Sequence, residues 1–199
     1  MDAETQEIIA HIYASREGFQ TVLPWFESLK TQGLNPLCIT MDGEQSVMRA
    51  IRQIWPLSLI QRCLYHIQRE GLRWLRTFPK TQAGTELRVL LRKLTGIRSF
   101  KDRDLFFDLY RQWFLAHKDF IPSLPNTTVE FKDLKRTMVL IKNALPDMFH
   151  YLKDPNIPHT ANLLEGFYSR LKQDYRRHRG LTQANKLHYL SWYCYFKNQ

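Results

Sequence analysis

Residues 37–66 read LCITMDGEQSVMRAIRQIWPLSLIQRCLYH, and this stretch decides the fold class. It opens with Leu37–Asp42, a short and nearly continuous apolar run that predicts a central β-strand buried on both faces. Apolar residues then recur at helical spacing, at Val47, Ile51, Ile54 and Trp55. Pro56 ends this predicted helix, and Ser58–Tyr65 follows as another predicted strand.

The residues before this stretch extend the same alternation of strand and helix. Glu7–Ala14 reads EIIAHIYA, and its β-branched and apolar residues predict a strand. The next segment, from about Thr21 to Gln32, predicts a helix that ends at Gly33. The first third of the chain therefore predicts the order β–α–β–α–β, which is typical of a parallel α/β layer.

The pattern changes after His66. Residues 67–155 show helical spacing interrupted by prolines and glycines, which predicts several helices with little strand. Two further helices are predicted, from about Thr160 to Arg177 and from about Thr182 to Phe196. No repeat or flexible linker divides the chain. We therefore expect residues 1–199 to form a single α/β domain that contains a helical insertion at residues 67–155.

Charge is the unusual feature of the composition. The chain carries 29 basic and 19 acidic residues, a net charge of +10, and a strong basic excess favours a polyanionic partner such as nucleic acid. The excess lies in two blocks: residues 61–103 hold 11 basic and 3 acidic groups, and residues 166–199 hold 7 and 1. Such asymmetry favours a binding face over a generally soluble surface. No apolar run is long enough to predict a membrane span, and the three cysteines predict no disulfide framework, so a reducing cytosol is expected.

Two carboxylates stand at positions where chemistry is common. Asp42 ends the predicted central strand, at the sheet edge where α/β proteins collect ligands, and it could hold a hard cation such as Mg²⁺. A turn or N-cap aspartate is the competing interpretation. Glu165 lies on the predicted helix at the border between an apolar face and a polar stripe. The competing interpretation there is a solvated glutamate.

Cys63 and His66 have the spacing of half a zinc site. A structural zinc needs four ligands, and no second pair of this kind is present. A packed cysteine and a hydrogen-bonded histidine therefore explain the pair better, although a zinc-dependent interaction protein stays an alternative.

The segment Arg170–Gly180, RLKQDYRRHRG, gathers cationic groups at the end of a predicted helix. Contact with phosphates is the functional interpretation. Complementing the negative end of the helix dipole is the structural one. The surplus of basic residues in the whole C-terminal block favours phosphate contact.

These features occur in an order that resembles the DDE transposases of the Mutator-like superfamily and their bacterial insertion-sequence relatives. The resemblance covers nearly the whole chain and rests on the motifs D-G, W-P, Q-R-C-x-x-H and T-x-N-x-x-E. Here they are Asp42-Gly43, Trp55-Pro56, Gln61-Arg62-Cys63 through His66, and Thr160 with Asn162 and Glu165.

The resemblance implies an RNase H-like core, a mixed sheet with flanking helices, and an all-helical insertion before the last catalytic helix. It implies that Asp42 and Glu165 are catalytic and hold Mg²⁺ or Mn²⁺ in a two-metal site without zinc. Cys63, His66 and Asn162 would lie near the active site. The implied partner is DNA, both transposon ends and target, in a bacterial cytoplasm at the nucleoid. The residues expected to contact DNA are Arg62, Arg69, Arg73, Arg170, Lys172, Arg176, Arg177 and Arg179.

One departure from the family pattern affects activity. The family carries its first catalytic aspartate on a strand ahead of the one that resembles EIIAHIYA, and the sequence begins just before that strand. We therefore expect a core without its first strand, weak or absent strand transfer, and an unpaired sheet edge that a homodimer could cover. A non-catalytic nucleic-acid-binding module derived from a transposase is the alternative function.

Overall fold

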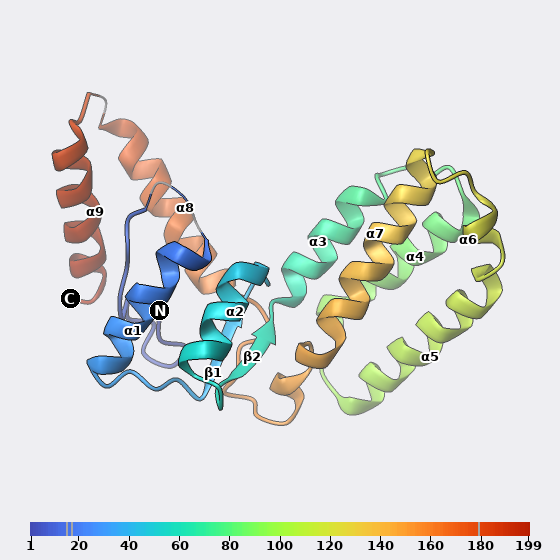
Figure 1. Ribbon diagram of the computed structural model, residues 1–199, viewed down its shortest axis with the longest axis horizontal. Helices are drawn as coiled ribbons and strands as arrows, with labels where there is room; N and C mark the ends of the chain where they lie inside the picture. The colour runs from blue at the N-terminus through green and yellow to red at the C-terminus, as the bar shows by residue number, and fades with distance from the viewer. Residues whose placement is uncertain (15, 17, 179) are drawn as a thin grey trace.

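The computed structural model describes residues 1–14, 16, 18–178 and 180–199. It is an elongated, mostly helical α/β structure with two lobes, which meet near β2 and the start of α3 (Figure 1). We call residues 64–152 the helical lobe and the rest the sheet lobe. The elements are α1 (Phe19–Thr31), β1 (Cys38–Met41), α2 (Gln45–Ile54), β2 (Leu59–Arg62), α3 (Leu64–Trp74), α4 (Gln82–Lys93), α5 (Phe100–His117), α6 (Phe120–Ser123), α7 (Val129–Ala144), α8 (Asn162–Arg177) and α9 (Gln183–Lys197), with 3₁₀ turns η1 (Leu94–Gly96), η2 (Leu145–Asp147) and η3 (His150–Leu152).

The two central strands form a parallel pair, as the sequence predicts. Cys38 is opposite Leu59 and Met41 is opposite Arg62, and α2 connects the strands. The helices α1 and α2 cover one face through a core around Val22, Ile51 and Ile60. The expectation that the first of these strands is buried on both faces is wrong. All four residues of β1 are half-buried, because among the described residues only β2 pairs with it.

The predicted strand Glu7–Ala14 is also wrong. Residues 7–14, all of them described, form no strand. The backbone of Ile8 is instead paired with one side chain, since its N–H donates to Asn198 Oδ1 at 2.8 Å and its carbonyl accepts from Asn198 Nδ2 at 3.1 Å. The segment thus lies beside the end of α9 and contributes Ile8 to a small core with Phe167 and Cys194. The α/β class is confirmed, whereas an RNase H-like core stays a prediction.

The predicted helices of residues 67–155 are confirmed, and the helical lobe contains the larger cores. One core lies at the far end of the lobe and includes Leu87, Leu91, Leu134 and Ile141. Another lies at the end next to the sheet and includes Leu64, Ile67 and Met148. Gly71 lets α3 approach its neighbours closely, because a Cβ there would stand 2.5 Å from a methyl group of Leu91.

Gln61 joins the helical lobe to the sheet. Its side chain is fully buried, and its amide nitrogen donates to the carbonyl of Met148 at 2.8 Å. Its amide oxygen accepts from the Tyr151 N–H at 3.3 Å. On the surface, Arg52 of α2 pairs with Asp147 at 3.1 Å. These contacts hold the end of the helical lobe against β2, the strand that leads directly into α3.

Candidate active site at the carboxyl edge of the parallel strands

The strand register brings Asp42 and Cys63 to the same edge of the sheet. Asp42 directly follows β1 and Cys63 directly follows β2, and the Cys63 N–H donates to the carbonyl of Met41 at 2.8 Å. The turn after Asp42 needs Gly43, whose φ of +97° is unfavourable for residues with a side chain. Parallel strands of an α/β layer characteristically present ligand-binding groups at this edge.

The segment that leads into α8 is fastened to the ends of both strands. Thr40 Oγ1 donates to the carbonyl of Pro158 at 2.9 Å, and the Leu64 N–H donates to the carbonyl of His159 at 2.9 Å. The Ala161 N–H donates to Cys63 Sγ at 3.2 Å. Cys63 is fully buried, so its thiol acts here as a structural acceptor. Together these bonds place the first turn of α8 beside the sheet edge.

Glu165 lies in that first turn and pairs with His66 of α3. Glu165 Oε1 is 2.8 Å from His66 Nε2, and the exposed fractions of the side chains are 39% and 13%. His66 Nδ1 is buried and has no hydrogen-bond partner among the described residues. We therefore assign the ring proton to Nε2, because a buried Nδ1–H without an acceptor would cost more than a bare lone pair. The structure thus brings together Cys63, His66 and Glu165.

The carboxylate of Asp42 is exposed at the same edge. Asp42 Oδ1 accepts from the Glu44 N–H at 3.1 Å, which is the turn geometry that the competing interpretation expects. Asp42 makes no ion pair with any residue that the structure describes, so its charge faces solvent. The turn role and a ligand role are compatible, because one hydrogen bond leaves most of the acceptor capacity of the carboxylate unused.

Arg62 lies beneath the turn, not on the surface where a DNA contact was expected. Its side chain is 3% exposed, and its Nη2 donates to the carbonyl of Asp42 at 3.0 Å. Burial lowers the pKa of the Arg62 guanidinium, and the negative charge of Asp42 offsets part of that effect. The guanidinium occupies the space that a Cβ on Gly43 would need. Arg62 therefore packs against the buried side of the Asp42 turn and stabilises it by a hydrogen bond.

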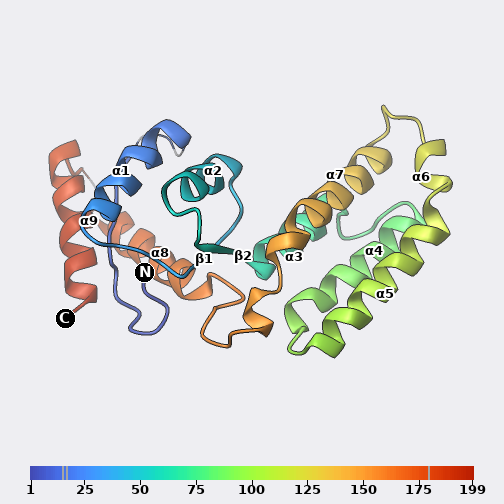
Figure 2. The same ribbon diagram turned by 60° about the horizontal axis from the view of Figure 1, so that its bottom comes forward.

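Most of the other predicted DNA-binding residues are exposed on α3 and α8. These helices leave the strand ends in opposite directions (Figures 1 and 2). Arg73 pairs with Glu70 at 2.6 Å and Arg177 with Asp174 at 3.6 Å, so part of the charge is compensated locally. Arg179 lies outside the described residues. The exposed predicted residues are Arg69, Arg73, Arg170, Lys172, Arg176 and Arg177, together with Asn162 at the start of α8.

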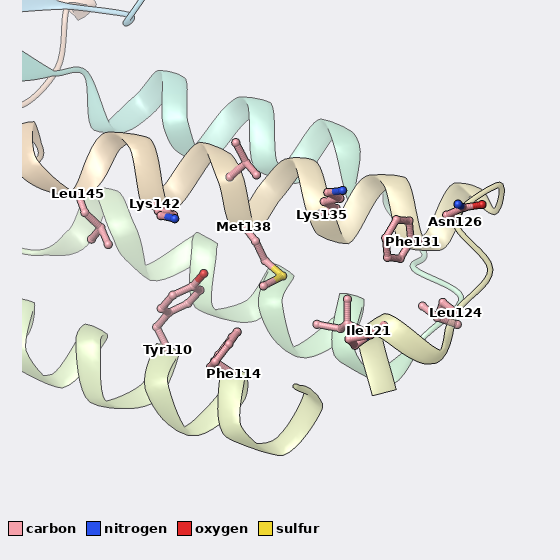
Figure 3. A pocket seen from close by; sticks show the side chains of 12 residues that line it. Tyr110, Phe114, Ile121, Leu124, Asn126, Phe131, Lys135, Met138, Lys142 and Leu145 are labelled. Atoms are coloured by element: carbon pink, nitrogen blue, oxygen red, sulfur yellow. The ribbon is translucent and has the colours of Figure 1, made fainter. Parts of the chain in front are cut away.

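A cavity that none of these groups lines lies in the helical lobe. It measures about 760 Å³ and lies between α5, α6 and α7 (Figure 3). Its lining is mostly apolar, with Tyr110, Phe114 and Met138 facing the hollow and Lys135 and Lys142 on α7. Burial raises the pKa of Tyr110 to about 12. The described residues that line the cavity include no carboxylate or histidine, so it is not the candidate site.

Sequence reasoning missed residues of the helical lobe that line a hollow together with the Asp42 turn. This smaller hollow of about 390 Å³ is lined by Trp74 of α3 and by Arg136 and Asn143 of α7, as well as by Gly43 and Arg62. The spacing of Arg136 and Asn143, seven residues apart on one helix face, was the available signal. Nothing in the local sequence connects that face with the Asp-Gly turn.

The ligand atoms available at the strand edge are of the type that a hard divalent cation binds. Asp42 and Glu165 offer carboxylate oxygens, the ligands that Mg²⁺ prefers in proteins. Among the described residues, no group of three or more His, Cys, Asp or Glu is arranged to hold a metal ion. The fit to such a cation therefore rests on the ligand type of these two carboxylates.

Comparison with known families decides the class of protein. The sequence model described as "Transposase, Mutator family" matches residues 2–179, most of the chain. The chain belongs to the Mutator family of transposases. No curated protein and no solved structure matches it. The match spans the Asp42 turn, the Cys63–His66 segment and Glu165, so the family assignment covers the whole candidate site. None of the described helices is long and apolar enough to cross a membrane.

Proposed function

We propose that this chain is a DDE transposase core that cleaves and joins DNA strands by phosphoryl transfer, with Asp42 and Glu165 as ligands of Mg²⁺ or Mn²⁺. The pairing of Glu165 with His66 carries the proposal, because it brings a carboxylate 123 residues beyond Asp42 to the strand edge. Family membership makes transposition the relevant reaction. Two bound divalent cations would activate the attacking oxygen and stabilise the leaving oxygen.

The protein's own residues position the reaction. His66 donates to Glu165 Oε1 and fixes the direction of that carboxylate, as outer-shell partners of metal ligands commonly do. The bonds of residues 158–161 to the strand ends fix the first turn of α8. The exposed cations of α3 and α8 hold the DNA backbone on either side of the strand edge, since phosphate contacts orient a duplex without reading its sequence.

Metal binding and DNA cleavage test the proposal together. Mn²⁺ binding is measured by calorimetry, and cleavage is measured on a duplex that carries the transposon end. Asp42→Asn and Glu165→Gln should each abolish the Mn²⁺ heat and reduce any cleavage to background. Glu27→Gln is the matched control, because it removes one exposed carboxylate from α1 far from the sheet edge. Wild-type Mn²⁺ binding in both site variants would overturn the assignment.

A non-catalytic DNA-binding module is the second candidate, favoured because no group of three or more His, Cys, Asp or Glu among the described residues is arranged to hold a metal ion. It keeps the exposed basic faces of α3 and α8. Under this alternative, affinity for DNA falls steeply with added salt in wild type and Asp42→Asn alike, and no Mn²⁺ binds. A flat salt response would exclude both nucleic-acid functions. Stoichiometric zinc in the purified protein would instead support the zinc-dependent alternative.

A further inference from the structure

The hollow at the Asp42 turn is lined by residues of both lobes. It measures about 390 Å³, which is within the range of about 300–1,000 Å³ typical of small-molecule sites. The C-terminal half of α7 runs toward the sheet alongside α3 (Figures 1 and 2), and residues 135–143 of α7 contribute to the lining of the hollow. The lining consists of Gly43, Gln45, Arg62, Trp74, Lys135, Arg136, Val139, Leu140 and Asn143.

A buried cation without an ion-pair contact among the described residues lines this hollow. Arg62 is 97% buried, and its Nε has no hydrogen-bond partner among the described residues. Arg62 makes no ion pair with any of them, and its Nη2 donates to a neutral acceptor, the carbonyl of Asp42. A buried guanidinium without an ion-pair contact is costly, and an anion bound in the hollow would offset part of that cost.

The other walls of the hollow add positive charge and a flat ring. Arg136 and Lys135 line it from α7, and neither makes an ion pair in the part of the chain that the structure describes. None of its described lining residues is acidic. Trp74 contributes an indole, and Asn143 and Gln45 contribute amides. Guanidinium groups suit phosphate oxygens, and aromatic faces suit bases.

We propose that this hollow is a nucleotide subsite, in which Arg62 and Arg136 bind the phosphate of one nucleotide of the DNA strand and Trp74 stacks on its base. The inference rests on the proposed function, because it places the nucleotide next to Asp42. It extends the proposed DNA-binding surface to α7. Arg62 then has two contacts, the carbonyl of the Asp42 turn and the phosphate.

Small probes without metal test the subsite. Inorganic phosphate, thymidine 5′-monophosphate and thymidine are titrated separately in EDTA, with the Arg62 Nε–H signal followed by NMR. Both phosphate-bearing probes should move that signal and thymidine should not. The nucleotide should bind about fivefold or more tightly than inorganic phosphate, because its base adds stacking on Trp74, and Trp74→Leu should remove the difference. No movement of the Nε–H signal at saturating nucleotide would overturn the subsite.

Arg136→Gln is the main variant because Arg136 is exposed and its loss leaves the fold intact. It should weaken nucleotide binding about tenfold, the loss of one charge-assisted contact. Arg111→Gln on α5 removes the same charge from an exposed position and should change affinity less than about twofold. Equal losses of nucleotide affinity in the two variants would show that binding depends only on net charge, and this result would refute the subsite. Because EDTA is present, failure here leaves Mn²⁺ binding by Asp42 and Glu165 untouched, and the two proposals fail separately.

Discussion

The helical lobe and the sheet edge satisfy their polar groups very differently. In the helical lobe, side chains cap α4, α5 and α7 through Thr81, Ser99 and Thr128. At the sheet edge, Arg62 Nε and His66 Nδ1, the latter in the first turn of α3 where the helical lobe begins, are the buried side-chain nitrogens that lack a partner among the described residues. Unsatisfied buried groups are rare in native structures and concentrate where function requires them. We infer that the helical lobe supplies stability and that the sheet edge supplies chemistry.

Leu91→Ala gives the largest expected effect and tests the first half of this comparison. Leu91 is fully buried in the distal core of the helical lobe. Its truncation should lower the free energy of unfolding by about 2–5 kcal/mol, because the core cannot fully collapse around the cavity. Urea denaturation followed by circular dichroism measures the change. Val89→Ala, on the same helix but 53% exposed, should cost less than about 0.5 kcal/mol. Similar losses in both variants would show that this core does not hold the lobe together.

His66→Ala tests the second half and should impair the site more than the fold. The imidazole directs Glu165, so its loss should weaken Mn²⁺ affinity about 10- to 100-fold, as for outer-shell partners elsewhere. Calorimetry measures the affinity. His66→Gln should recover most of it, because the glutamine amide nitrogen can occupy the position of Nε2. His66→Asn, whose amide corresponds to Nδ1, should not. Equal behaviour of the Gln and Asn variants would remove the positioning role.

Local pattern was enough to predict the parallel strands, and it failed where distant residues decide. The stretch LCITMD and the helix after it are adjacent in sequence, and their alternation of strand and helix is visible in a single window. The segment Glu7–Ala14 has the composition of a strand, but the backbone N–H and carbonyl of Ile8 are hydrogen-bonded to the side chain of Asn198, 190 residues away. A β-rich composition predicts a strand only where a neighbouring strand is present to pair with it.

The sequence motifs identify the residues of the site, but they do not predict which of these residues pair, which are buried and which lie next to one another. The motifs identify His66 and Glu165 without showing that the two pair. Arg62 follows an apolar run and precedes a buried cysteine, and its burial depends on Gly43, nineteen residues earlier, having no Cβ. Arg136 looks like an ordinary cation on a helix surface until α7 is placed beside the Asp-Gly turn. These relations arise from tertiary packing, which no sequence window contains.

Ser99→Ala should produce a smaller loss in the helical lobe. The Ser99 hydroxyl accepts from the Asp102 N–H at 3.1 Å, and the Asp102 carboxylate accepts from the Ser99 N–H at 2.9 Å. This reciprocal cap satisfies the start of α5, and its removal should cost about 1 kcal/mol in urea denaturation. Ser123→Ala, whose hydroxyl donates to the carbonyl of Phe120 three residues before it, should cost less. If the two serine variants are equally stable, the caps are not part of what stabilises this lobe.

Glu86→Gln should have the smallest effect, visible mainly in its pH dependence. The His117 ring and then the Gln82 amide, which both bond to the Glu86 carboxylate, hold its pKa below the ordinary value of 4.5. A lowered folded-state pKa contributes stability that is complete above pH 4.5 and is lost as the pH falls through the folded value. Because the Glu86 side chain is 43% exposed, that contribution should stay below about 1 kcal/mol.

The difference in unfolding free energy between wild type and Glu86→Gln measures this contribution, at pH 7 and at intervals down to pH 3. It should shrink steadily below pH 4.5, since the wild-type carboxylate then becomes protonated and resembles the amide. Asp108→Asn on α5 is the control, because Asp108 is exposed and makes no ion pair within the described part of the chain. Its difference from wild type should be small throughout. A Glu86→Gln difference that stays constant with pH would mean that the contact between α4 and α5 depends on packing and not on the charge of Glu86.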